Sequence, residues 1–536
     1  MYAEGRSALP NCQKKDEDHS NLCLRLLYLI RMQERLMMKY VIGVDLGTSA
    51  VKILLVNQQG EVTQEVSKSY PLIQEKVGYS EQNPNDWVEQ TVAGLSELLA
   101  DLNGNPEDIE GLSFSGQMHG LVLLDENNEV LRNAILWNDT RTTKECEEIY
   151  GKVGKERLLE ITKNPALEGF TLPKILWVKN HEPEVFNQAK AFVLPKDYVR
   201  LKLTEQLHME YSDAAGTLLL NVAEKTWSKE ICEILDINPE ICPPLVGSHD
   251  EVGTITAGIA EATGLSPATK VFVGGADNAC GAIGSGILED GKTLASTGTS
   301  GVVLSYEANG DKDFEGKVHY FNHGAPEVFY TMGVTLAAGY SLSWFKDTFA
   351  KEIDFNELLA DIDSVPVGSN GLIFTPYIVG ERTPHVDANI RGSFIGMDAS
   401  HERKHFARAV LEGITFSLNE SVEIFRENGK NIDTVVSIGG GAKNESWLQM
   451  QADIFNATIV KMQSEQGPGM GAAMLAAFGC GWFDTLKECA DEFLKEDKVY
   501  TPIPENVERY KGLFAIYQEV YGKTNELNEQ LMDYRN

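Results

Sequence analysis

The amino-acid sequence predicts an α/β fold made of two similar domains. The chain has 536 residues, more than one ordinary domain, and its 43% of hydrophobic residues can fill a sizeable core. Strand-length apolar runs alternate with segments of helical apolar spacing, which is typical of sheets layered against helices. A Gly-Thr-Ser turn between strand-like runs occurs at 47–49 and again at 298–300. Three common turn residues are weak evidence alone, but their domain-sized separation leads us to test for a duplicated architecture.

The first half begins with strands. Apolar runs at 40–45, 51–56 and 61–66 are separated by polar turns and predict an antiparallel meander. Helical apolar spacing follows over 85–102, and a buried strand is expected at 109–114. This alternation of strands and helices is the pattern of an α/β domain.

Elements of the same two kinds fill the second half. They are expected as a strand at 293–296, a helix at 401–428, a strand at 434–438, a helix from about 445 to 455, a strand at 458–462 and a helix at 470–478. We place the domain boundary at the turn of Asp290 and Gly291, which gives domains over 38–288 and 289–525. Residues 1–37 precede the first strand, carry no motif and are expected to lie outside the fold.

Composition excludes several classes of protein. The formal net charge of −32 would repel the phosphates of nucleic acids. No apolar run approaches the ~18 residues of a membrane-spanning helix. The eight cysteines are scattered without a CxxC pair, which is typical of reduced thiols. We therefore expect a cytoplasmic protein that binds neither nucleic acid nor membrane. Its oligomeric state stays open, with a homodimer as one alternative.

The first Gly-Thr-Ser turn follows a carboxylate at the end of a strand. Backbone N–H groups of the 47–49 turn can point at phosphate oxygens, and the two hydroxyls add donors. Asp45 can hold Mg²⁺, which usually takes one or two carboxylates and keeps several waters. The structural alternative is an Asx-type turn between hairpin strands. The second copy at 298–300 favours phosphate binding, because two such hairpins could hold one nucleoside triphosphate from both sides.

A glycine-rich turn with one acid lies near the end of the first half. A strand at 271–273 leads into Gly274 and Gly275, which let a ligand approach the backbone, and Asp277 stands where a helix begins. In a phosphotransfer enzyme Asp277 would accept the proton of the attacking hydroxyl group. An aspartate at this place is equally typical of a helix N-cap.

Two polar turns have the composition of a sugar site. Residues 115–120 (SGQMHG) place His119 where it could donate to a sugar oxygen, although a lone histidine is more often structural. Residues 137–141 (WNDTR) put the flat ring of Trp137 beside an amide and a carboxylate. An aromatic ring can stack on the apolar face of a sugar while such polar groups bind its hydroxyls. The alternative for this second segment is a surface turn.

Two further glycine-containing segments differ in how well they support phosphate binding. The loop 439–444 (GGGAKN) joins a strand to a helix, where a nucleotide can lie against backbone N–H groups, but a lone glycine run is weak evidence. The segment 286–293 (GILEDGKT) matches the phosphate-loop pattern GxxxxGK[ST]. A helical run precedes it and a strand follows, the reverse of what that loop requires, so we interpret it as a turn at the domain junction.

In order and spacing, these segments resemble the FGGY family of carbohydrate kinases, and within it the kinases of xylulose. The resemblance spans roughly 40–520 and is carried by the segments 45–49, 115–120, 135–141, 194–198, 211–217, 274–278, 296–301, 380–385 and 438–442. Any one of them is weak, but their common order is specific. The resemblance implies an actin-like ATPase fold, in which two domains with ribonuclease-H-like cores enclose a cleft.

The resemblance also implies roles for individual residues. Asp277 would be the catalytic base, and Asp45 would be needed at the phosphate and Mg²⁺ site. Contacts to the sugar are assigned to Gln117, Met118, His119, Trp137, Asn138, Asp139 and Asn278. Contacts to ATP are assigned to Gly47, Thr48, Ser49, Lys52, Gly298, Thr299, Ser300, Gly440, Gly441 and Asn444.

The chain departs from the family pattern in places. Ala50 and Ala276 replace glycines that often stand there, and 164–169 (NPALEG) differs more, near the expected sugar site. The sequence thus predicts ATP-dependent phosphorylation of D-xylulose to D-xylulose 5-phosphate in pentose catabolism. One alternative is a kinase of another sugar, polyol or sugar acid, such as ribulose or gluconate. The other is a non-catalytic actin-like ATP-binding protein.

Overall fold

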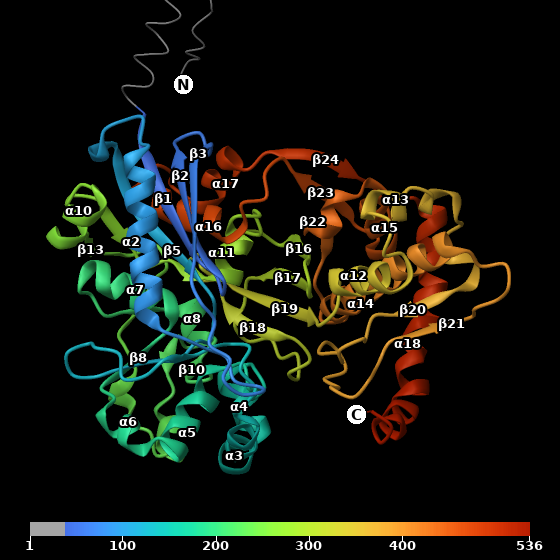
Figure 1. The fold of residues 1–536 in the computed structure, drawn as a ribbon, viewed down its shortest axis with the longest axis horizontal. Helices are drawn as coiled ribbons and strands as arrows, with labels where there is room; N and C mark the ends of the chain where they lie inside the picture. Colours follow the sequence, from blue (N-terminus) through green and yellow to red (C-terminus); the bar gives the residue numbers. More distant parts are fainter. Residues whose placement is uncertain (1–37, 536) are drawn as a thin grey trace, which may run out of the picture.

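The computed structural model describes residues 38–535. The prediction for 1–37 lies outside the described residues. Figure 1 shows two sheets side by side, with the first half of the chain on the left and the second half on the right. Among residues 38–535 there is no helix both long and apolar enough to cross a membrane.

The N-terminal sheet is built around three antiparallel strands. These are β1 (Tyr40–Leu46), β2 (Ala50–Asn57) and β3 (Val62–Ser69). On its other side β1 pairs in parallel with β5 (Ile109–Gly116), and β5 pairs in parallel with β14 (Lys270–Phe272). The edge strand β13 (Glu251–Thr254) completes the order β13-β14-β5-β1-β2-β3. The predicted meander and the strand at 109–114 are confirmed.

The C-terminal sheet repeats this pairing. Its strands are β16 (Gly291–Thr297), β17 (Gly301–Glu307), β18 (His319–Asn322), β19 (Phe329–Thr335), β22 (Ile432–Gly439), β23 (Thr458–Met462) and β24 (Glu496–Tyr500). As β1 does in its sheet, β16 pairs antiparallel with the next strand, β17, and parallel with a later one, β22. The outer pairs also match. The pair β17–β19 is antiparallel like β2–β3, and β22–β23 is parallel like β5–β14. The edge pair β23–β24 is antiparallel like β14–β13. The expected duplication of the core is therefore confirmed.

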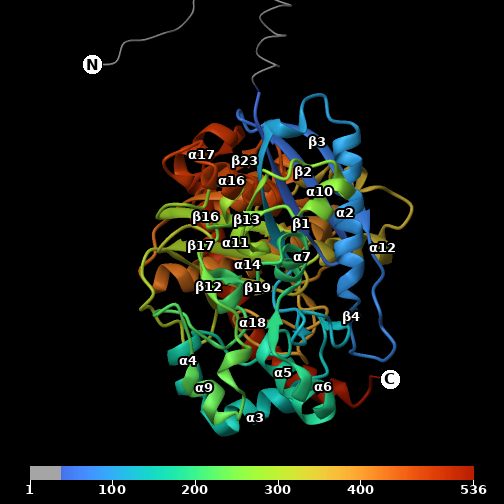
Figure 2. The same cartoon turned by 90° about the vertical axis from the view of Figure 1, so that its left-hand side faces the viewer.

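Helices cover both faces of the N-terminal sheet. On one face, α2 (Pro84–Ala100) begins after the N-cap Asn83 and buries Trp87, Leu95 and Leu98 beside β2 and β3. On the other face lies α16 (Gly467–Gly479), which comes from the second half of the chain. Figure 2 shows the two helices on opposite sides of the strands.

The helix α16 packs against α11 (Asp277–Ile283) and β1 so closely that side chains are excluded from the contact. A Cβ atom at Gly471 would stand 1.9 Å from the carbonyl oxygen of Cys280. One at Gly43 would stand 2.1 Å from the carbonyl oxygen of Gly469. Both distances are far inside van der Waals contact, so these positions require glycine. The two halves of the chain are interlocked at this crossing.

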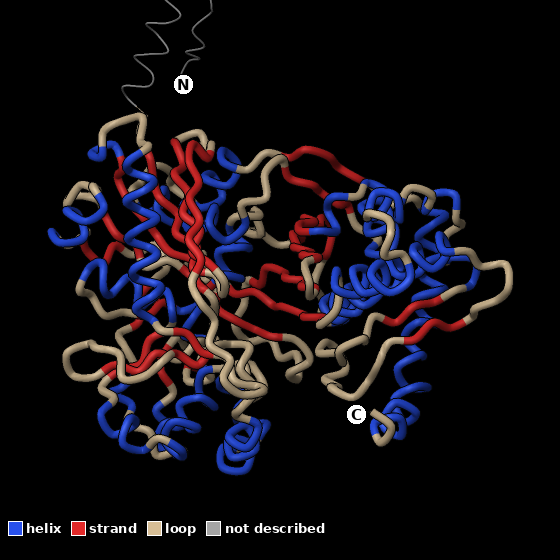
Figure 3. The backbone as a smooth tube through the Cα atoms, viewed as in Figure 1, coloured by secondary structure: helices blue, strands red, loops and turns tan. Residues whose placement is uncertain are grey.

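Several of the remaining helices lie away from the two sheets, and the blue segments at the lower left of Figure 3 form a group of their own below the N-terminal sheet. In the first half the remaining helices include α3 (Thr143–Val153), α4 (Lys155–Thr162), α5 (Thr171–His181), α6 (Pro183–Gln188), α7 (Pro195–Thr204), α8 (Tyr211–Ala215), α9 (Lys229–Ile234) and α10 (Ala257–Thr263). In the second half they include α12 (Gly339–Phe349), α13 (Phe355–Leu359), α14 (Arg403–Glu427), α15 (Glu445–Phe455), α17 (Leu486–Phe493) and α18 (Pro504–Met532). The predicted helices at 401–428, 445–455 and 470–478 are confirmed, with ends shifted by at most a few residues.

The segment 286–293 does not have the context of a phosphate loop. The helix α11 precedes it and the strand β16 follows it. Lys292 Nζ lies 3.0 Å from a carboxylate oxygen of Glu289, so the lysine is engaged within the turn itself. The expected order of helix, turn and strand is confirmed.

Candidate active site

The two Gly-Thr-Ser turns occupy the same place in the two sheets. The turn 47–49 joins β1 to β2, and the turn 298–300 joins β16 to β17. Two residues before the glycine, the first strand has Asp45 and the second has Ser296. Of the two turns, only the first therefore brings a carboxylate that could face a phosphate or a metal ion.

Asp277 begins α11 directly after β15 (Gly275–Ala276), a two-residue strand that pairs with the end of β5. The N-cap interpretation is wrong, because Ala276 holds that position and the Asp277 carboxylate does not cap the helix. Instead, Asp277 Oδ1 accepts hydrogen bonds from the backbone N–H (2.7 Å) and the side-chain amide (3.0 Å) of Asn278. Burial, and then the negative charge of Asp45, raise the pKa of Asp277 to about 7. A carboxylate with this pKa is well matched to accept a proton at neutral pH.

His119 is fixed through its backbone. Its φ of 67° lies in the left-handed region, which is uncommon for a residue with a side chain and is often found at functional sites. Its carbonyl oxygen accepts hydrogen bonds from Thr171 Oγ1 (3.1 Å) and Lys174 Nζ (3.0 Å). The helix α5 therefore holds this turn in place.

The ring of His119 has a defined tautomer. Its Nδ1 lies 2.7 Å from the carbonyl oxygen of Gly216, and because that oxygen can only accept, Nδ1 carries the proton. Burial lowers the pKa of His119 to about 3, so the ring stays neutral and Nε2 is an acceptor. The expectation that His119 donates to a sugar oxygen is wrong: Nε2 would accept a hydrogen bond from a hydroxyl group.

Met118 and Asn278 connect His119 to Asp277. Asn278 Nδ2 lies 3.5 Å from Met118 Sδ, in addition to its hydrogen bond with Asp277. A Cβ atom at Gly216 would stand 3.0 Å from Met118 Cε and 2.9 Å from His119 Nδ1, so glycine leaves room for both side chains. The structure thus brings four of the predicted residues together at the N-terminus of α11.

A chain of hydrogen bonds joins the predicted sugar residues to the first turn. Trp137 Nε1 donates to Thr48 Oγ1 (2.9 Å), and Thr48 Oγ1 donates to Gln117 Oε1 (3.3 Å). Gln117 Nε2 donates to Gln82 Oε1 (3.2 Å), and Gln82 Nε2 donates back to the carbonyl oxygen of Thr48 (2.7 Å). The Trp137 side chain is nevertheless 46% exposed, so it is accessible to a ligand. The hydroxyl of Thr48, predicted to face phosphate, is thus hydrogen-bonded to two residues that were predicted to contact the sugar, Trp137 and Gln117.

The other members of the 137–141 turn differ from Trp137. Asp139 is fully buried, and its carboxylate accepts hydrogen bonds from Arg141 and from the backbone N–H of Ser80 (2.6 Å). These bonds fasten the turn to the body of the domain. Asp139 therefore stabilises the turn, whereas Asn138 is exposed beside Trp137.

A cavity of about 410 Å³ in the second half is lined by half of the predicted nucleotide residues, and those of the 47–49 turn are not among them. Gly298, Thr299, Gly440, Gly441 and Asn444 line it, together with Gly339, Tyr340, Phe355 and Trp447. Flat apolar rings and backbone N–H groups of glycines are suited to a base and its phosphates. The predicted residues Ser300 and Lys52 are not part of this lining, and Lys52 Nζ instead pairs with Glu65 Oε1 at 3.2 Å.

Two groups of residues were missed by the sequence reasoning. The aromatic lining of the cavity gave no motif, because Tyr340, Phe355 and Trp447 are far apart along the chain. Arg382 lies in the segment 380–385, which carried the resemblance but received no role. Its guanidinium makes no hydrogen bond or ion pair with any residue that the structure describes.

Arg382 belongs to the second half but acts electrostatically on the first. After burial and Lys174, its positive charge further lowers the pKa of His119. Arg382 is partly buried, and the carboxylates of Glu168 and Glu381 act on its charge. Its closeness to the His119 site makes it a candidate contact for an anionic ligand.

Comparisons with known proteins bear on this site. Residues 40–284 match the N-terminal domain of the FGGY family of carbohydrate kinases, and residues 293–480 match its C-terminal domain. The chain is 63% identical to the xylulose kinase of Bacillus subtilis over 498 residues, which cover 93% of this chain and 100% of that protein. It is 38% identical to the xylulose kinase of Escherichia coli over 488 residues, covering 90% and 98% of the two chains.

Solved structures give the same picture. The xylulose kinase from Lactobacillus acidophilus aligns with a TM-score of 0.87 and 31% identity, over 92% of this chain and 100% of that one. A gluconate kinase from the same organism aligns with a TM-score of 0.86 and 31% identity, over 91% and 98%. The two-domain architecture of these kinases is therefore the architecture of this chain.

Proposed function

The chain belongs to the FGGY family of carbohydrate kinases, and on that basis we propose that it transfers the γ-phosphoryl group of ATP to the 5-hydroxyl group of D-xylulose. The choice of sugar is supported by the 63% identity to the Bacillus subtilis xylulose kinase. The observation that carries the proposal is Asp277, whose pKa is about 7 and which lies beside Asn278, Met118 and His119. The products would be D-xylulose 5-phosphate and ADP.

Asp277 would act as the general base. A primary hydroxyl is a poor nucleophile until its proton can leave, and the Asp277 carboxylate can take this proton as the bond to phosphorus forms. Asn278 holds one carboxylate oxygen through two hydrogen bonds, which leaves the other free to face the hydroxyl. ADP would leave as the bond between the β–γ bridging oxygen and the γ-phosphorus breaks.

The sugar would bind beside this base. His119 Nε2 would accept a hydrogen bond from one hydroxyl, and Met118 would supply an apolar contact. Trp137 is accessible and adjoins the first Gly-Thr-Ser turn, where its ring could cover the sugar. These contacts would place the 5-hydroxyl group against Asp277, so that positioning supplies much of the rate.

The nucleotide would bind in the cavity of the second half, with its phosphates directed at the Gly-Thr-Ser turns. Asp45 fits a Mg²⁺ site, because its carboxylate is partly buried and forms no ion pair with the described residues. Mg²⁺ would then be held by one carboxylate, phosphate oxygens and water, which is its usual environment, and would neutralise phosphate charge. Arg382, whose guanidinium makes no hydrogen bond or ion pair with the described residues, would add a second positive charge.

One alternative acceptor has support of its own. The gluconate kinase structure matches the chain as well as a xylulose kinase structure does, and the Arg382 guanidinium could bind the carboxylate of a sugar acid. Membership of a kinase family argues against the non-catalytic alternative.

The test is ADP release with a panel of acceptors. D-xylulose, D-ribulose, gluconate and glycerol should be compared at equal concentration with saturating ATP and Mg²⁺. We expect D-xylulose to give the highest kcat/KM. A higher kcat/KM for gluconate would mean that the acceptor is a sugar acid. ADP release that no acceptor stimulates would overturn the kinase assignment.

A further inference from the structure

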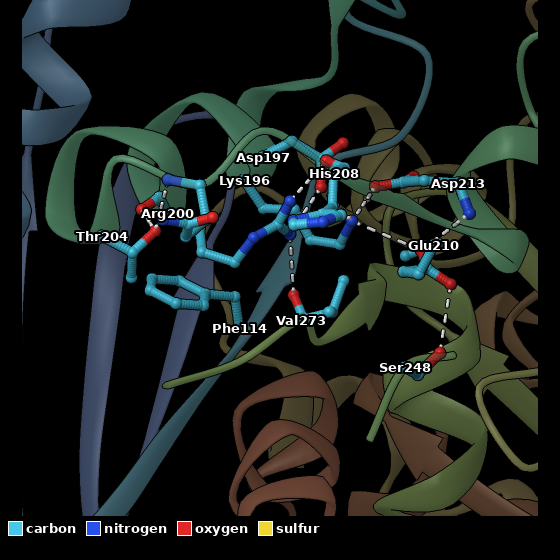
Figure 4. A network of polar contacts seen from close by, with 12 residues as sticks. Phe114, Lys196, Asp197, Arg200, Thr204, His208, Glu210, Asp213, Ser248 and Val273 are labelled. Carbon is cyan, nitrogen blue, oxygen red and sulfur yellow. Dashed lines mark hydrogen bonds and ion pairs between the residues drawn. The ribbon is translucent and has the colours of Figure 1, made fainter. Parts of the chain in front are cut away.

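Two segments that carried the family resemblance received no role, and they meet in one buried cluster of charges. Lys196, Asp197 and Arg200 come from α7, and Glu210 and Asp213 come from β9 (Met209–Glu210) and α8. Each of the five side chains is at most 1% exposed. Figure 4 shows them gathered between the helices of the first half and Val273.

Lys196 is the centre of this ion cluster. Its Nζ lies 2.7 Å from Asp213 Oδ2, 3.0 Å from Asp197 Oδ1 and 3.3 Å from Glu210 Oε1. Arg200 Nη1 reaches the same Asp197 oxygen at 2.8 Å. Burial raises the pKa of Asp213, so a proton there can balance three carboxylates against two cations.

The strand pairing that leads to Asp277 is interrupted between β14 and β15, and the cluster region contacts the backbone on both sides of this break. The strand β14 ends at Phe272, and β15 begins at Gly275. Between them Gly274 has a φ of +88°, and a Cβ atom there would stand 2.0 Å from the carbonyl oxygen of Phe114. The sheet therefore loses its regular hydrogen bonds just before the catalytic aspartate.

One hydrogen bond from the cluster and one from the adjacent Ser212 hold the residues on either side of Gly274. Before it, Arg200 Nη1 donates to the carbonyl oxygen of Val273 (3.0 Å). After it, the backbone N–H of Ala276 donates to Ser212 Oγ (3.0 Å). Ser212 Oγ is itself fixed because it donates to Glu210 Oε2 (2.7 Å).

We propose that the buried ion cluster, acting through Ser212 and Arg200, is the device that positions Asp277 for catalysis. The proposal rests on the proposed function, because it takes Asp277 to be the base. A cluster of fully buried charges is weak evidence for stability, since apolar residues of similar volume often stabilise as well. The geometry of this cluster is specific, however, and its hydrogen bonds fix the residues on either side of Gly274. Ser212 and Arg200 are thus positioning residues that need not touch the substrate.

The first test is Ser212→Ala, which removes the acceptor of the Ala276 N–H. A small displacement of a catalytic group can cost up to ~10²-fold in rate, so kcat should fall by roughly 10- to 100-fold. The KM values for sugar and ATP should stay within about three-fold, because the variant leaves both binding regions intact. An unchanged kcat would overturn the proposal.

The matched control is Ser369→Ala in the second half. Ser369 is fully buried, and its Oγ donates to the buried Glu412 Oε2 at 2.7 Å, the same distance as the bond from Ser212 to Glu210. This variant should lose similar thermal stability while kcat stays within about two-fold. An equal loss of kcat in Ser369→Ala would mean that any lost buried serine slows the enzyme, which would also overturn the proposal.

A double variant separates positioning from a general structural effect. If Ser212 acts through Asp277, adding Ser212→Ala to Asp277→Asn should slow the residual reaction by less than about three-fold. The same factor in both backgrounds would contradict this. Should Ser212→Ala fail to fold, Arg200→Lys carries the test, because lysine keeps the charge beside Asp197 without the fork that reaches Val273.

A crystal structure of Ser212→Ala gives a result that does not depend on the acceptor. A displaced or disordered Asp277 carboxylate supports the proposal, and an unmoved one overturns it. A parent enzyme that phosphorylates no sugar would overturn the proposed function and leave this structural result intact.

Discussion

Asp277 is partly buried beside the negative charge of Asp45, and this environment raises its pKa to about 7. The two carboxylates come from equivalent central parts of one sheet: Asp45 lies on β1, and Asp277 follows the strand that pairs with β5, the neighbour of β1. Under the proposed function, Asp45 would hold a metal ion and Asp277 would accept a proton. This pairing of acids with different tasks is the basis of the first prediction.

The activity should fall on the acid side of neutrality. A base must be deprotonated to accept a proton, and below a pKa of about 7 the Asp277 carboxyl holds its own proton. We expect kcat/KM for the sugar to fall towards ten-fold per pH unit below pH 7 and to be level above it. An aspartate with its ordinary pKa of about 3.9 would give a level profile down to about pH 5.

The control for this profile is the residual activity of Asp277→Asn. The phosphates of ATP also titrate near this range, and that contribution would remain in the variant. Only the part of the acid limb that belongs to Asp277 should therefore disappear when Asp277 is replaced. A limb of the same shape in Asp277→Asn would assign it to the nucleotide.

His119→Asn should weaken sugar binding without affecting ATP. Asparagine tolerates the positive φ of this position but is too short to present an acceptor where Nε2 lies. Losing an acceptor for a hydroxyl group costs about 1–3 kcal/mol, so KM for the sugar should rise roughly ten-fold or more. KM for ATP should stay within about two-fold, because His119 belongs to the other half of the chain from the nucleotide cavity.

His181→Asn on α5 is the matched control, because that ring is half exposed and lies outside the site. Both of its KM values should equal those of the parent. The acid limb should also persist in His119→Asn, since the pKa of His119 is about 3 and its ring does not titrate near neutrality. Loss of the limb in His119→Asn would contradict the assignment of the limb to Asp277.

Gly471→Ala should destabilise the protein through the crossing of α16 and α11. The added Cβ would stand 1.9 Å from the carbonyl oxygen of Cys280, which is backbone and cannot rotate away. Overpacking costs typically 1–3 kcal/mol and a backbone clash should reach the upper end, so we expect Tm to fall by about 3 °C. Gly512→Ala on α18 is the control: nothing lies within 4 Å of its added Cβ, and Tm should stay equal or rise. Equal Tm values for the two variants would mean that the crossing can open at little cost.

The sequence predicts most strands and helices correctly because their signal is local. The runs that became β1, β2 and β3, and the helical spacing that became α2, are properties of neighbouring residues. The position of α16 is different. Its small residues predict a helix, but nothing in them shows that it packs on the sheet of the other half, which is decided by glycines such as Gly43 far away in the chain.

The site shows the same division. The motifs that contain Asp277, His119 and Gly298 were found because residue types at fixed spacing carry chemistry. The tautomer of His119 was not, because it depends on the carbonyl oxygen of Gly216, 97 residues away. Asp139 has the composition of a sugar ligand, but its burial and its bonds to Arg141 are visible only in three dimensions.

Asp277→Asn tests the assignment of the base directly. Asparagine keeps the size of the side chain and can still accept a hydrogen bond from Asn278, but it cannot accept a proton. General-base contributions are typically ~10²–10⁴-fold, so kcat should fall by at least about 10²-fold. Nucleotide binding, measured by calorimetry, should change little, because the cavity is lined by residues of the second half.

Thermal stability separates this effect from a structural one. The folded-state pKa of Asp277, about 7, lies above the ordinary aspartate value of 3.8, so the carboxylate disfavours folding progressively as the pH rises between these values. Asp277→Asn removes this ionisation, and at pH 8 its Tm should equal or exceed that of the parent. A loss of kcat together with a much lower Tm would indicate that Asp277 supports the start of α11, and a kcat near that of the parent would show that another group takes the proton.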